Sequence, residues 1–193
     1  MTDPATRLPS MRELDQMDLA SFISALAVLF EGAPVFVARL AADRPFGTYD
    51  QLLDRARVVA LAMPETEQLE LIDAHPRIGA PPAAVSPLSY EEQGYDREPD
   101  GLSATADEEA ARQRLRLDLE RLNDAHEARF GFRFVIFVAG RPRQDIAKHM
   151  EASLGADREA EKRRALADII EIARDRLRRI GAPDGWSTAK EAG

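Results

Sequence analysis

Apolar residues recur at helical spacing along most of the chain. Between residues 19 and 30 they follow the pattern i, i+3, i+4, i+7 and i+11, at Leu19, Phe22, Ile23, Leu26 and Phe30. A second stripe runs through Leu166, Ile169, Ala173, Leu177 and Ile180 and is followed by Gly181. Residues at this spacing lie on one face of an amphipathic helix, and glycine favours the end of a helix. Both stripes therefore predict helices that bury one side.

Residues with strong positional preferences predict where further helices begin and end. Pro34 suits the first turn of a second helix, and Thr48 with Gln51 forms a T-x-x-Q capping box that opens a third. Pro64 ends that third helix, because proline disfavours helical geometry in the residue before it. We expect further helices over residues 67–73, from about 105 to 130 up to the break at Phe130-Gly131-Phe132, and over 144–154.

One stretch departs from the helical pattern. Residues 133–138 are aromatic and β-branched, which is typical of a strand or a buried extended segment. The whole pattern predicts an all-α, single-domain helical bundle with a short extended segment near residues 133–138. We place the domain at residues 15–181, after an N-terminal arm (1–14) and before a C-terminal tail (182–193).

Composition and charge exclude several classes of function. A length of 193 residues fits one domain, and 26 Lys and Arg against 34 Asp and Glu give a net charge of −8. This acidic balance argues against a nucleic-acid partner, which needs a basic face. The lack of cysteine excludes thiolate catalysis, iron–sulfur clusters and cysteine zinc sites. No apolar run approaches the roughly 20 residues that span a bilayer, so we expect a cytoplasmic protein with no membrane partner.

Motifs for cofactors and metals are also absent from the sequence. The chain has no P-loop, no G-x-G-x-x-G, no G-x-S-x-G and no pair of histidines at i, i+4. Two basic clusters lie in the terminal helix, at Lys162-Arg163-Arg164 and at Arg174-Asp175-Arg176-Leu177-Arg178-Arg179. Acidic residues interleave with them, so we interpret both as the solvated face of that helix, with cations favoured near its C-terminus.

Two of the three histidines have ordinary structural explanations. His126 follows Leu119 and Leu122 on an apolar helix face, which indicates a core or interface residue. His149 lies on a polar helix and is expected to face solvent.

His75 differs because it directly precedes Pro76, which biases it away from helical geometry. Its imidazole then projects from a rigid loop, His75-Pro76-Arg77-Ile78-Gly79. Loops on a rigid scaffold often carry functional sites. The alternative is a helix stop with an incidental histidine.

The segment Ser89-Tyr90-Glu91-Glu92-Gln93 has two compatible interpretations. Ser89 as an N-cap, with Glu92 three residues later, is a capping box. Glu92 and Gln93 near a helix N-terminus also offer an acceptor and a mixed donor–acceptor to a urea-like or amide-like ligand. Backbone N–H groups of the same helix turn would suit a carboxylate.

Three blocks occur in order along the chain: Ala74-His75-Pro76-Arg77-Ile78-Gly79, then Ser89-x-x-Glu92-Gln93, then Phe130-Gly131-Phe132-Arg133-Phe134-Val135-Ile136 running on to Gly140-Arg141. Together they resemble the family of 2-oxo-4-hydroxy-4-carboxy-5-ureidoimidazoline (OHCU) decarboxylases. The terminal helix from Ile169 to Leu177 also fits the family's ending. The resemblance covers roughly residues 15 to 181, and the order and spacing of the blocks make it specific.

This resemblance implies an all-helical carboxy-lyase, usually a homodimer, that needs no cofactor and no metal. The family catalyses the last step of urate conversion to (S)-allantoin. The resemblance implies that His75 and Glu92 are catalytic, with His75 as the acid–base group that protonates one face. The residues expected to bind substrate are Pro76, Ser89, Gln93, Arg141 and the main chain of Phe134, Val135 and Ile136.

Two features depart from the family pattern. An insertion, Gly94 to Asp100, follows the Glu-Gln pair and precedes Gly101-Leu102. Ser153 stands before Leu154, where the family carries an arginine that helps to hold the substrate. The residues that could replace this cation are Arg77, Arg141, Arg143 and Lys148.

Two other readings of the sequence stay open. A diverged member of the family would act on a related ureido or hydantoin-like acid, or would have lost activity, and Ser153 with the insertion motivates this reading. A non-catalytic helical interaction module would use the Leu115–Leu122 face or the final helix as its interface. It predicts that His75, Glu92 and Gln93 are scattered in space.

Overall fold

The computed structural model describes residues 8–81, 85–93 and 105–181, apart from the side chains of Leu88, Ser89 and Glu91. The predicted tail at 182–193 and the insertion at 94–100 lie outside the described residues.

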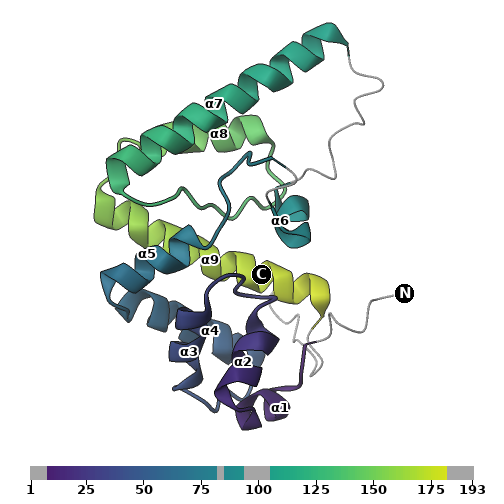
Figure 1. The fold of residues 1–193 in the computed structure, drawn as a ribbon, viewed down its shortest axis with the longest axis vertical. Helices are drawn as coiled ribbons and strands as arrows, with labels where there is room; N and C mark the ends of the chain where they lie inside the picture. Colours follow the sequence, from purple (N-terminus) through teal and green to yellow (C-terminus); the bar gives the residue numbers. More distant parts are fainter. Residues whose placement is uncertain (1–7, 82–84, 94–104, 182–193) are drawn as a thin grey trace, which may run out of the picture. The chain divides into compact units, whose positions relative to one another are not determined.

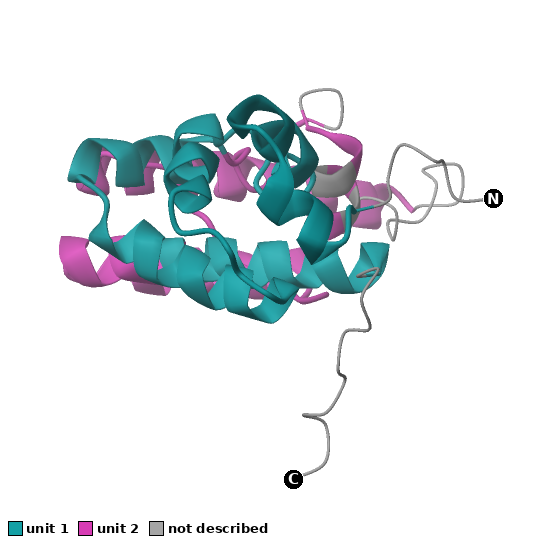
Figure 2. Ribbon diagram, turned by 90° about the horizontal axis from the view of Figure 1, so that it is seen from below, with its two compact units in different colours: residues 1–74, 166–193 teal, residues 75–165 magenta. Residues whose placement is uncertain are grey.

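The chain divides into two compact units (Figure 2). Unit 1 consists of residues 1–74 and 166–193, and unit 2 consists of residues 75–165. All the residues that the sequence assigns to the site belong to unit 2.

Every regular element in the described part of the chain is a helix (Figure 1). Unit 1 contains α1 (Met11–Gln16), α2 (Leu19–Leu26), α3 (Pro34–Ala41), α4 (Tyr49–Ala62) and α5 (Glu65–Asp73). Unit 2 contains α6 (Pro87–Glu92), α7 (Ala106–Phe130) and α8 (Arg143–Ser153). The boundary between the units also falls after Ala165, inside α9 (Arg158–Ile180).

The all-α prediction is confirmed, and residues 133–138 form neither helix nor strand. No helix in the described ranges has both the length and the apolar character that crossing a bilayer requires.

Local sequence signals placed several helix ends correctly. Pro34 occupies the first turn of α3, and the Thr48 hydroxyl accepts the Gln51 N–H at 3.1 Å at the start of α4. Helix α7 begins with a capping box between Thr105 and Glu108 and ends at Gly131, which is left-handed with φ +79°. Left-handed geometry is accessible to glycine because it has no Cβ.

Two local predictions need correction. Helix α1 was not expected, although Ser10 and Glu13 form the capping box that opens it. Ser89 is not an N-cap, because α6 already begins at Pro87 and the Tyr90 N–H bonds to the Ser86 carbonyl at 2.8 Å. Proline has no N–H to satisfy and a helix-like φ, so the helix starts at Pro87, three residues before the start at Tyr90 that an N-cap at Ser89 would give.

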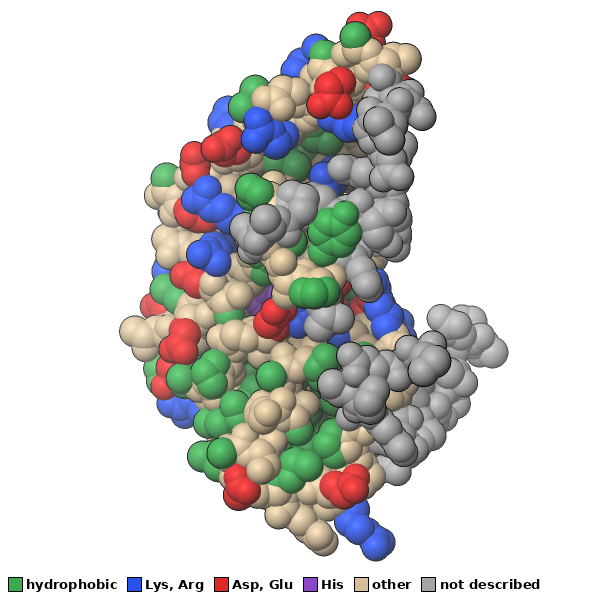
Figure 3. All heavy atoms as spheres, turned by 45° about the vertical axis from the view of Figure 1, so that its right-hand side comes forward, with side chains coloured by type: hydrophobic (Ala, Val, Ile, Leu, Met, Phe, Trp, Pro, Cys, Tyr) green, Lys and Arg blue, Asp and Glu red, His purple; other side chains and the backbone are tan. Residues whose placement is uncertain are grey.

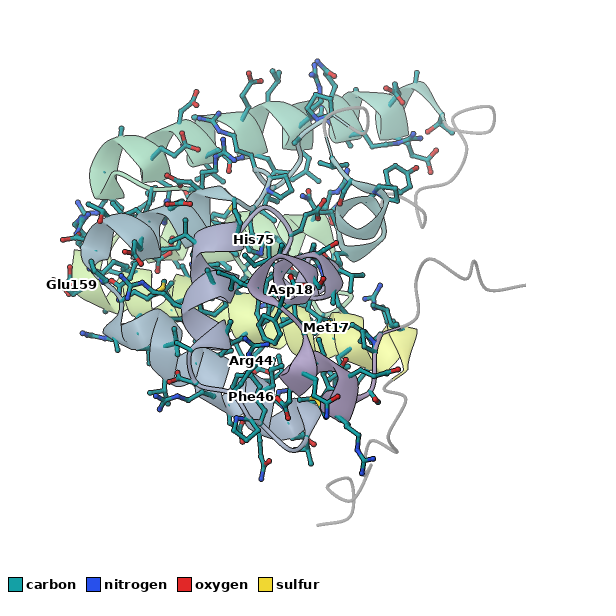
Figure 4. All side chains as sticks on the ribbon, turned by 60° about the horizontal axis from the view of Figure 1, so that its bottom comes forward. Met17, Asp18, Arg44, Phe46, His75 and Glu159 are labelled. Atoms are coloured by element: carbon teal, nitrogen blue, oxygen red, sulfur yellow. The ribbon has the colours of Figure 1, made fainter. Side chains whose placement is uncertain are left out.

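The core of unit 1 is built around α3, which packs against α2, α4 and α5. Its best-buried side chains, each at most 2% exposed, include Phe22, Leu26, Phe36, Leu40 and Leu53. Arg44 joins the connection before α4 to the start of the unit, since its guanidinium donates to the Met17 carbonyl at 2.6 Å (Figure 4).

The basic clusters of α9 are not uniformly solvated, contrary to the sequence interpretation. In unit 1, Arg176 is 1% exposed and lies 3.6 Å from the Glu31 carboxylate. In unit 2, Lys162 is buried and Arg164 is half-buried, while Arg163 is exposed. Helical spacing places every third or fourth residue on one face, so consecutive members of a basic run point in different directions and some of them turn inward.

The core of unit 2 joins the two non-helical stretches that carry the predicted site. Helix α7 packs against α8. The buried cluster consists of Ile78, Leu119, Leu122, Phe134, Ile136, Val138, Ile146 and Met150. Ile78 comes from the loop after His75, and Phe134 and Ile136 come from the segment after α7. On the surface of α7, acidic and basic side chains alternate (Figure 3) and form pairs such as Arg112 with Glu109.

Candidate active site

His75 leaves helical geometry where the sequence predicted. Helix α5 ends at Asp73, and His75 follows the helix cap at Ala74. The residue is 8% exposed, so most of the imidazole is inside the protein (Figure 4). A turn follows, in which the Ala80 N–H donates to the Arg77 carbonyl at 3.2 Å. Gly79 has φ +77° in this turn, a conformation that side chains with a Cβ rarely adopt.

Two amide side chains hold the backbone of this turn. Gln93 accepts the Gly79 N–H on Oε1 at 2.9 Å and donates from Nε2 to the Arg77 carbonyl at 3.2 Å. Asn123, on α7, donates from Nδ2 to the Ile78 carbonyl at 2.9 Å. Gln93 is 8% exposed and Asn123 is 2% exposed, so water competes little for these bonds.

Charged side chains add two more restraints to the loop. Arg77 donates to both carboxylate oxygens of Glu127, at 2.7 and 2.5 Å, and to Asp124 at 2.9 Å. The hydrogen bonds to Glu127 raise the pKa of Arg77 above its usual value. Arg133 donates to the carbonyl of His75 itself at 2.9 Å. The backbone is therefore restrained at His75 itself and in the turn that follows it.

The second stretch, after α7, is buried through Phe134, Val135 and Ile136, which are 0%, 3% and 4% exposed. Arg164 donates to the Val135 carbonyl at 2.8 Å and lies over the Phe134 ring. Among the described residues, nothing hydrogen-bonds to the backbone groups of Phe134 or Ile136. Buried backbone groups are normally paired, so these groups have capacity for a ligand or for water.

A network of titratable side chains bonds to this segment. The Nδ1 atom of His126 is 3.1 Å from the Phe132 carbonyl, and its Nε2 is 2.9 Å from Glu161. Glu161 also accepts two hydrogen bonds from Arg164, at 2.9 and 2.6 Å. His126 is 0% exposed, which confirms its interpretation as a core residue.

Glu161 stays ionised inside the protein. Burial alone would raise its pKa, but the hydrogen bonds from His126 and Arg164 outweigh burial and lower the pKa to about 2. The carboxylate therefore links the segment to α9 at any pH well above that value.

The remaining predicted site residues have mixed positions. Glu92 is half-buried as the last residue of α6, directly before Gln93, and Pro76 is half-buried. Arg141 is exposed, and its guanidinium donates to the carbonyls of Val138 and Phe137 in its own turn. Ser89 lies inside α6, and its side chain is outside the description.

The candidate replacements for the family arginine also differ. Ser153 is buried and donates to the Met150 carbonyl within α8. Arg77 is occupied by two carboxylates, and Lys148 is exposed and pairs with Asp145. Arg143 is half-buried and lines a cavity of about 600 Å³ beside the loop.

Three residues of this region were not anticipated from the sequence as parts of the site: Asn123, Glu161 and Arg164. Asn123 could have been noticed, because it is a polar residue on the apolar face that carries Leu119 and Leu122. Glu161 and Arg164 look like an ordinary helix pair at i, i+3, and their burial depends on tertiary packing. In the described ranges, no group of three or more His, Cys, Asp or Glu residues could hold a metal ion.

Comparison with known proteins decides the family. Residues 15–178 match the sequence model of the OHCU decarboxylases. This chain belongs to that family. A uric acid degradation bifunctional protein of Bacillus subtilis is 32% identical over 94% of this chain, but over only 34% of its own length. The chain spans about a third of the first curated relatives it matches.

Stand-alone relatives match along nearly their whole length. The OHCU decarboxylase of Haloferax volcanii is 29% identical over 87% of this chain and 94% of its own. A crystal structure of OHCU decarboxylase in the presence of (S)-allantoin has a TM-score of 0.59 at 20% identity, covering 80% of this chain and 96% of that one. A crystal structure of (S)-allantoin synthase also has a TM-score of 0.59, at 18% identity over 89% of this chain and 54% of its own. At these identities the two structures support the fold.

Proposed function

We propose that this chain decarboxylates OHCU to (S)-allantoin in urate degradation, with His75 as the acid–base group that protonates one face. The observation that carries the proposal is a buried histidine on a loop whose backbone is bonded by Gln93, the residue after Glu92. Family membership over residues 15–178 adds the reaction class. The convergence of His75 and Gln93 on one loop argues against the scattered arrangement of a non-catalytic module.

The substrate carries a carboxylate and a hydroxyl on a ring carbon next to a C=N bond. When the bond to CO₂ breaks, its electron pair forms a double bond between the two ring carbons, and the imine nitrogen takes a proton. The resulting enol becomes a carbonyl as the ureido-bearing carbon gains a proton. The imine serves as the electron sink, so the reaction needs no pyridoxal or thiamine. The protein has to orient the ring and deliver the last proton to one face.

His75 suits that proton transfer because histidine titrates near neutral pH. We propose that Glu92 orients His75 or binds the ureido N–H groups. Pro76 and Ser89 would contact the substrate, whereas both polar atoms of Gln93 bond to the loop that carries His75. The backbone groups of Phe134 and Ile136, which have no partner among the described residues, would bond the nitrogen-rich ring, with Val135 between them.

The substrate carboxylate needs a cation, and the family arginine is replaced by Ser153. Of the four replacements that the sequence allows, Arg143 is half-buried and lines the cavity beside the loop, whereas Arg77 pairs with two carboxylates and Arg141 and Lys148 are exposed. We propose Arg143 as the anchor and Arg141 as a support for its own segment. Arg143→Ala should then raise KM more than it lowers kcat.

An enantiomer-resolved assay tests the reaction. Freshly generated urate oxidation product is mixed with the purified protein and followed by circular dichroism. Accelerated formation of one allantoin enantiomer is the expected result. A racemic product at the spontaneous rate would exclude the reaction.

One observation favours a second candidate, a related ureido or hydantoin-like acid as substrate. Ser153 is buried and bonded to Met150, so the position of the family arginine offers no cation. The same assay separates the candidates: under the second one the urate product would give racemic allantoin at the spontaneous rate, while the chain would release CO₂ from a related ureido acid.

We further propose a homodimer that works in the cytoplasm, as the family resemblance implies, with the domain at residues 15–181. Light scattering on the purified protein should give about twice the chain mass of 21.4 kDa. A mass equal to one chain would exclude the dimer.

A further inference from the structure

We propose that Asn123 is a positioning residue: together with Gln93 it forms an amide clamp that fixes the Arg77–Gly79 backbone and thereby the place of His75. The proposal rests on the proposed function, because the acid–base role of His75 gives the clamp its purpose. It also gives Gln93 a role that differs from direct substrate binding.

The clamp binds three consecutive residues from two sides. Asn123 reaches the Ile78 carbonyl from α7, at 2.9 Å. Gln93 reaches the Arg77 carbonyl and the Gly79 N–H from the end of α6, at 3.2 and 2.9 Å. These bonds and the Ala80 bond to Arg77 hold the turn at several atoms, so it cannot pivot about any single one of them.

The hydrogen bonding of Asn123 indicates a purpose beyond stability. Its Nδ2 donates both to Ile78 and to the Leu119 carbonyl of its own helix, at 2.8 Å. Its Oδ1 is buried and has no hydrogen-bond partner within the described part of the chain. An unsatisfied buried acceptor is unfavourable and calls for an explanation. The amide is oriented to serve the loop carbonyl, at the expense of its own oxygen.

Gln93 is committed to the loop in the same way. Its oxygen and its nitrogen each bond to a backbone group of the loop. A side chain that bound substrate directly would keep at least one of these atoms available to the ligand. Gln93 therefore acts through the loop, and its substitution should change kcat more than KM.

Movement of the turn would reach His75 because little lies between them. Pro76 and Arg77 separate His75 from Ile78. The ring of Pro76 fixes its φ angle, so a shift of Ile78 is not absorbed there. A misplacement of a reacting group by about 1 Å can lower a rate about 100-fold.

Asn123→Ser is the selective variant. A serine in a helix can still bond the carbonyl four residues earlier, here Leu119, but is too short to reach Ile78. Asn123→Leu removes both bonds at similar size. Gln93→Met removes the opposite half of the clamp. We expect kcat to fall about 10- to 100-fold in each, KM to stay within about threefold, and the allantoin product to become partly racemic.

Gln68→Leu is the matched control. Gln68 is also a buried amide, 7% exposed, whose Nε2 donates to two backbone carbonyls, those of Ala60 and Leu61. These partners belong to α4 in unit 1. Gln68→Leu should lower the unfolding midpoint but leave kcat and the enantiomer ratio unchanged at temperatures where it is folded.

An NMR measurement tests the amide clamp independently of the proposed reaction, because it requires no enzymatic activity. The chain has three histidines, so the imidazole NMR signal of His75 is identified by its loss in His75→Asn. Asn123→Ser and Gln93→Met should shift this signal, and Gln68→Leu should not. If the wild type is inactive and the signal still shifts, the proposed function fails and the clamp stands.

Several outcomes overturn the clamp. An unshifted His75 signal in the folded Asn123 and Gln93 variants is one. Wild-type kcat and enantiomer ratio in these variants is another. If the Asn123 variants do not fold, Gln93→Met decides alone: a raised KM with unchanged kcat assigns Gln93 to the substrate and rejects the proposal.

Discussion

The two non-helical stretches of unit 2 are held in place by different chemistry. The turn from Arg77 to Gly79 is bonded by the uncharged amides of Gln93 and Asn123. The segment after α7 is bonded by side chains that carry or can carry charge. These side chains are Arg158, on the Phe130 carbonyl, His126, near the Phe132 carbonyl, and Arg164, on the Val135 carbonyl.

The hydrogen bonds that hold the turn should therefore be independent of pH, whereas those that hold the segment should depend on it. Amide groups do not titrate in water, so the turn should keep its geometry over a wide pH range. Arg164 and His126 meet at Glu161, and protonation of that carboxylate would remove the centre of the network. The turn would position the side chain of His75 for proton transfer, whereas the segment would offer the backbone groups of Phe134 and Ile136 to the substrate.

The largest expected effect follows from the side chain on the turn. His75→Asn should lower kcat by about 100- to 10,000-fold, while the far-UV circular dichroism spectrum stays that of the wild type. His149→Asn is the matched control, because His149 is an exposed histidine on α8. Wild-type turnover in folded His75→Asn protein would show that the turn does not carry the acid–base group.

As the pH falls, the segment after α7 should lose stability sooner than the Arg77–Gly79 turn does. The folded-state pKa of Glu161, about 2, is below the usual 4.5. Its contribution is therefore fully present above about pH 4.5 and is lost as the pH falls toward 2. The shift corresponds to about 3 kcal/mol. Urea unfolding between pH 6 and 3 should show a smaller decline in Glu161→Gln than in the wild type. Equal declines would mean that Glu161 does not hold the segment.

Each stretch contains a left-handed glycine, so alanine substitutions at the two glycines compare how tightly the stretches are packed. Gly79 and Gly131 have φ of +77° and +79°. A Cβ on Gly79 would meet Leu119 at 3.0 Å, whereas one on Gly131 would meet nothing within 4 Å. Both alanine variants should lose about 1–2 kcal/mol from backbone strain, and Gly79→Ala about 1 kcal/mol more from overpacking. Urea unfolding of both variants measures the difference, and equal losses would show that Leu119 gives way.

The smallest effect is expected outside both stretches. Lys148 is exposed and pairs with Asp145 at 2.9 Å. Lys148→Ala should change the free energy of unfolding by less than about 0.5 kcal/mol and should leave KM unchanged. A raised KM would make Lys148 the carboxylate anchor and would replace Arg143 in that role.

Local chemistry explains which parts of the fold could be predicted. Thr48, Thr105 and Gly131 define helix ends through bonds within four residues, so their neighbours in sequence suffice. Ser89 was misplaced by the same kind of reasoning, because two capping signals compete there and Pro87 starts the helix first. Helix α1 opens with a capping box at Ser10 and Glu13, but its residues 11–14 fall in the segment that the sequence analysis places in the arm.

Long-range contacts explain what could not be predicted. Asn123 and Ile78 are 45 residues apart, and His126 and Glu161 are 35 apart. Nothing in the neighbourhood of Glu161 distinguishes it from an exposed acid on an amphipathic helix. The solvated interpretation of Lys162 and Arg176 failed for the same reason.

The sequence by itself determined the helices, the break before Pro76 and the family to which the three blocks belong, because each depends on residues close together in the chain. Only the tertiary structure decided that amides hold the turn and that an ionised glutamate holds the segment. Burial and partner choice arise when distant elements pack, and packing converts an ordinary asparagine or glutamate into a restraint on the site.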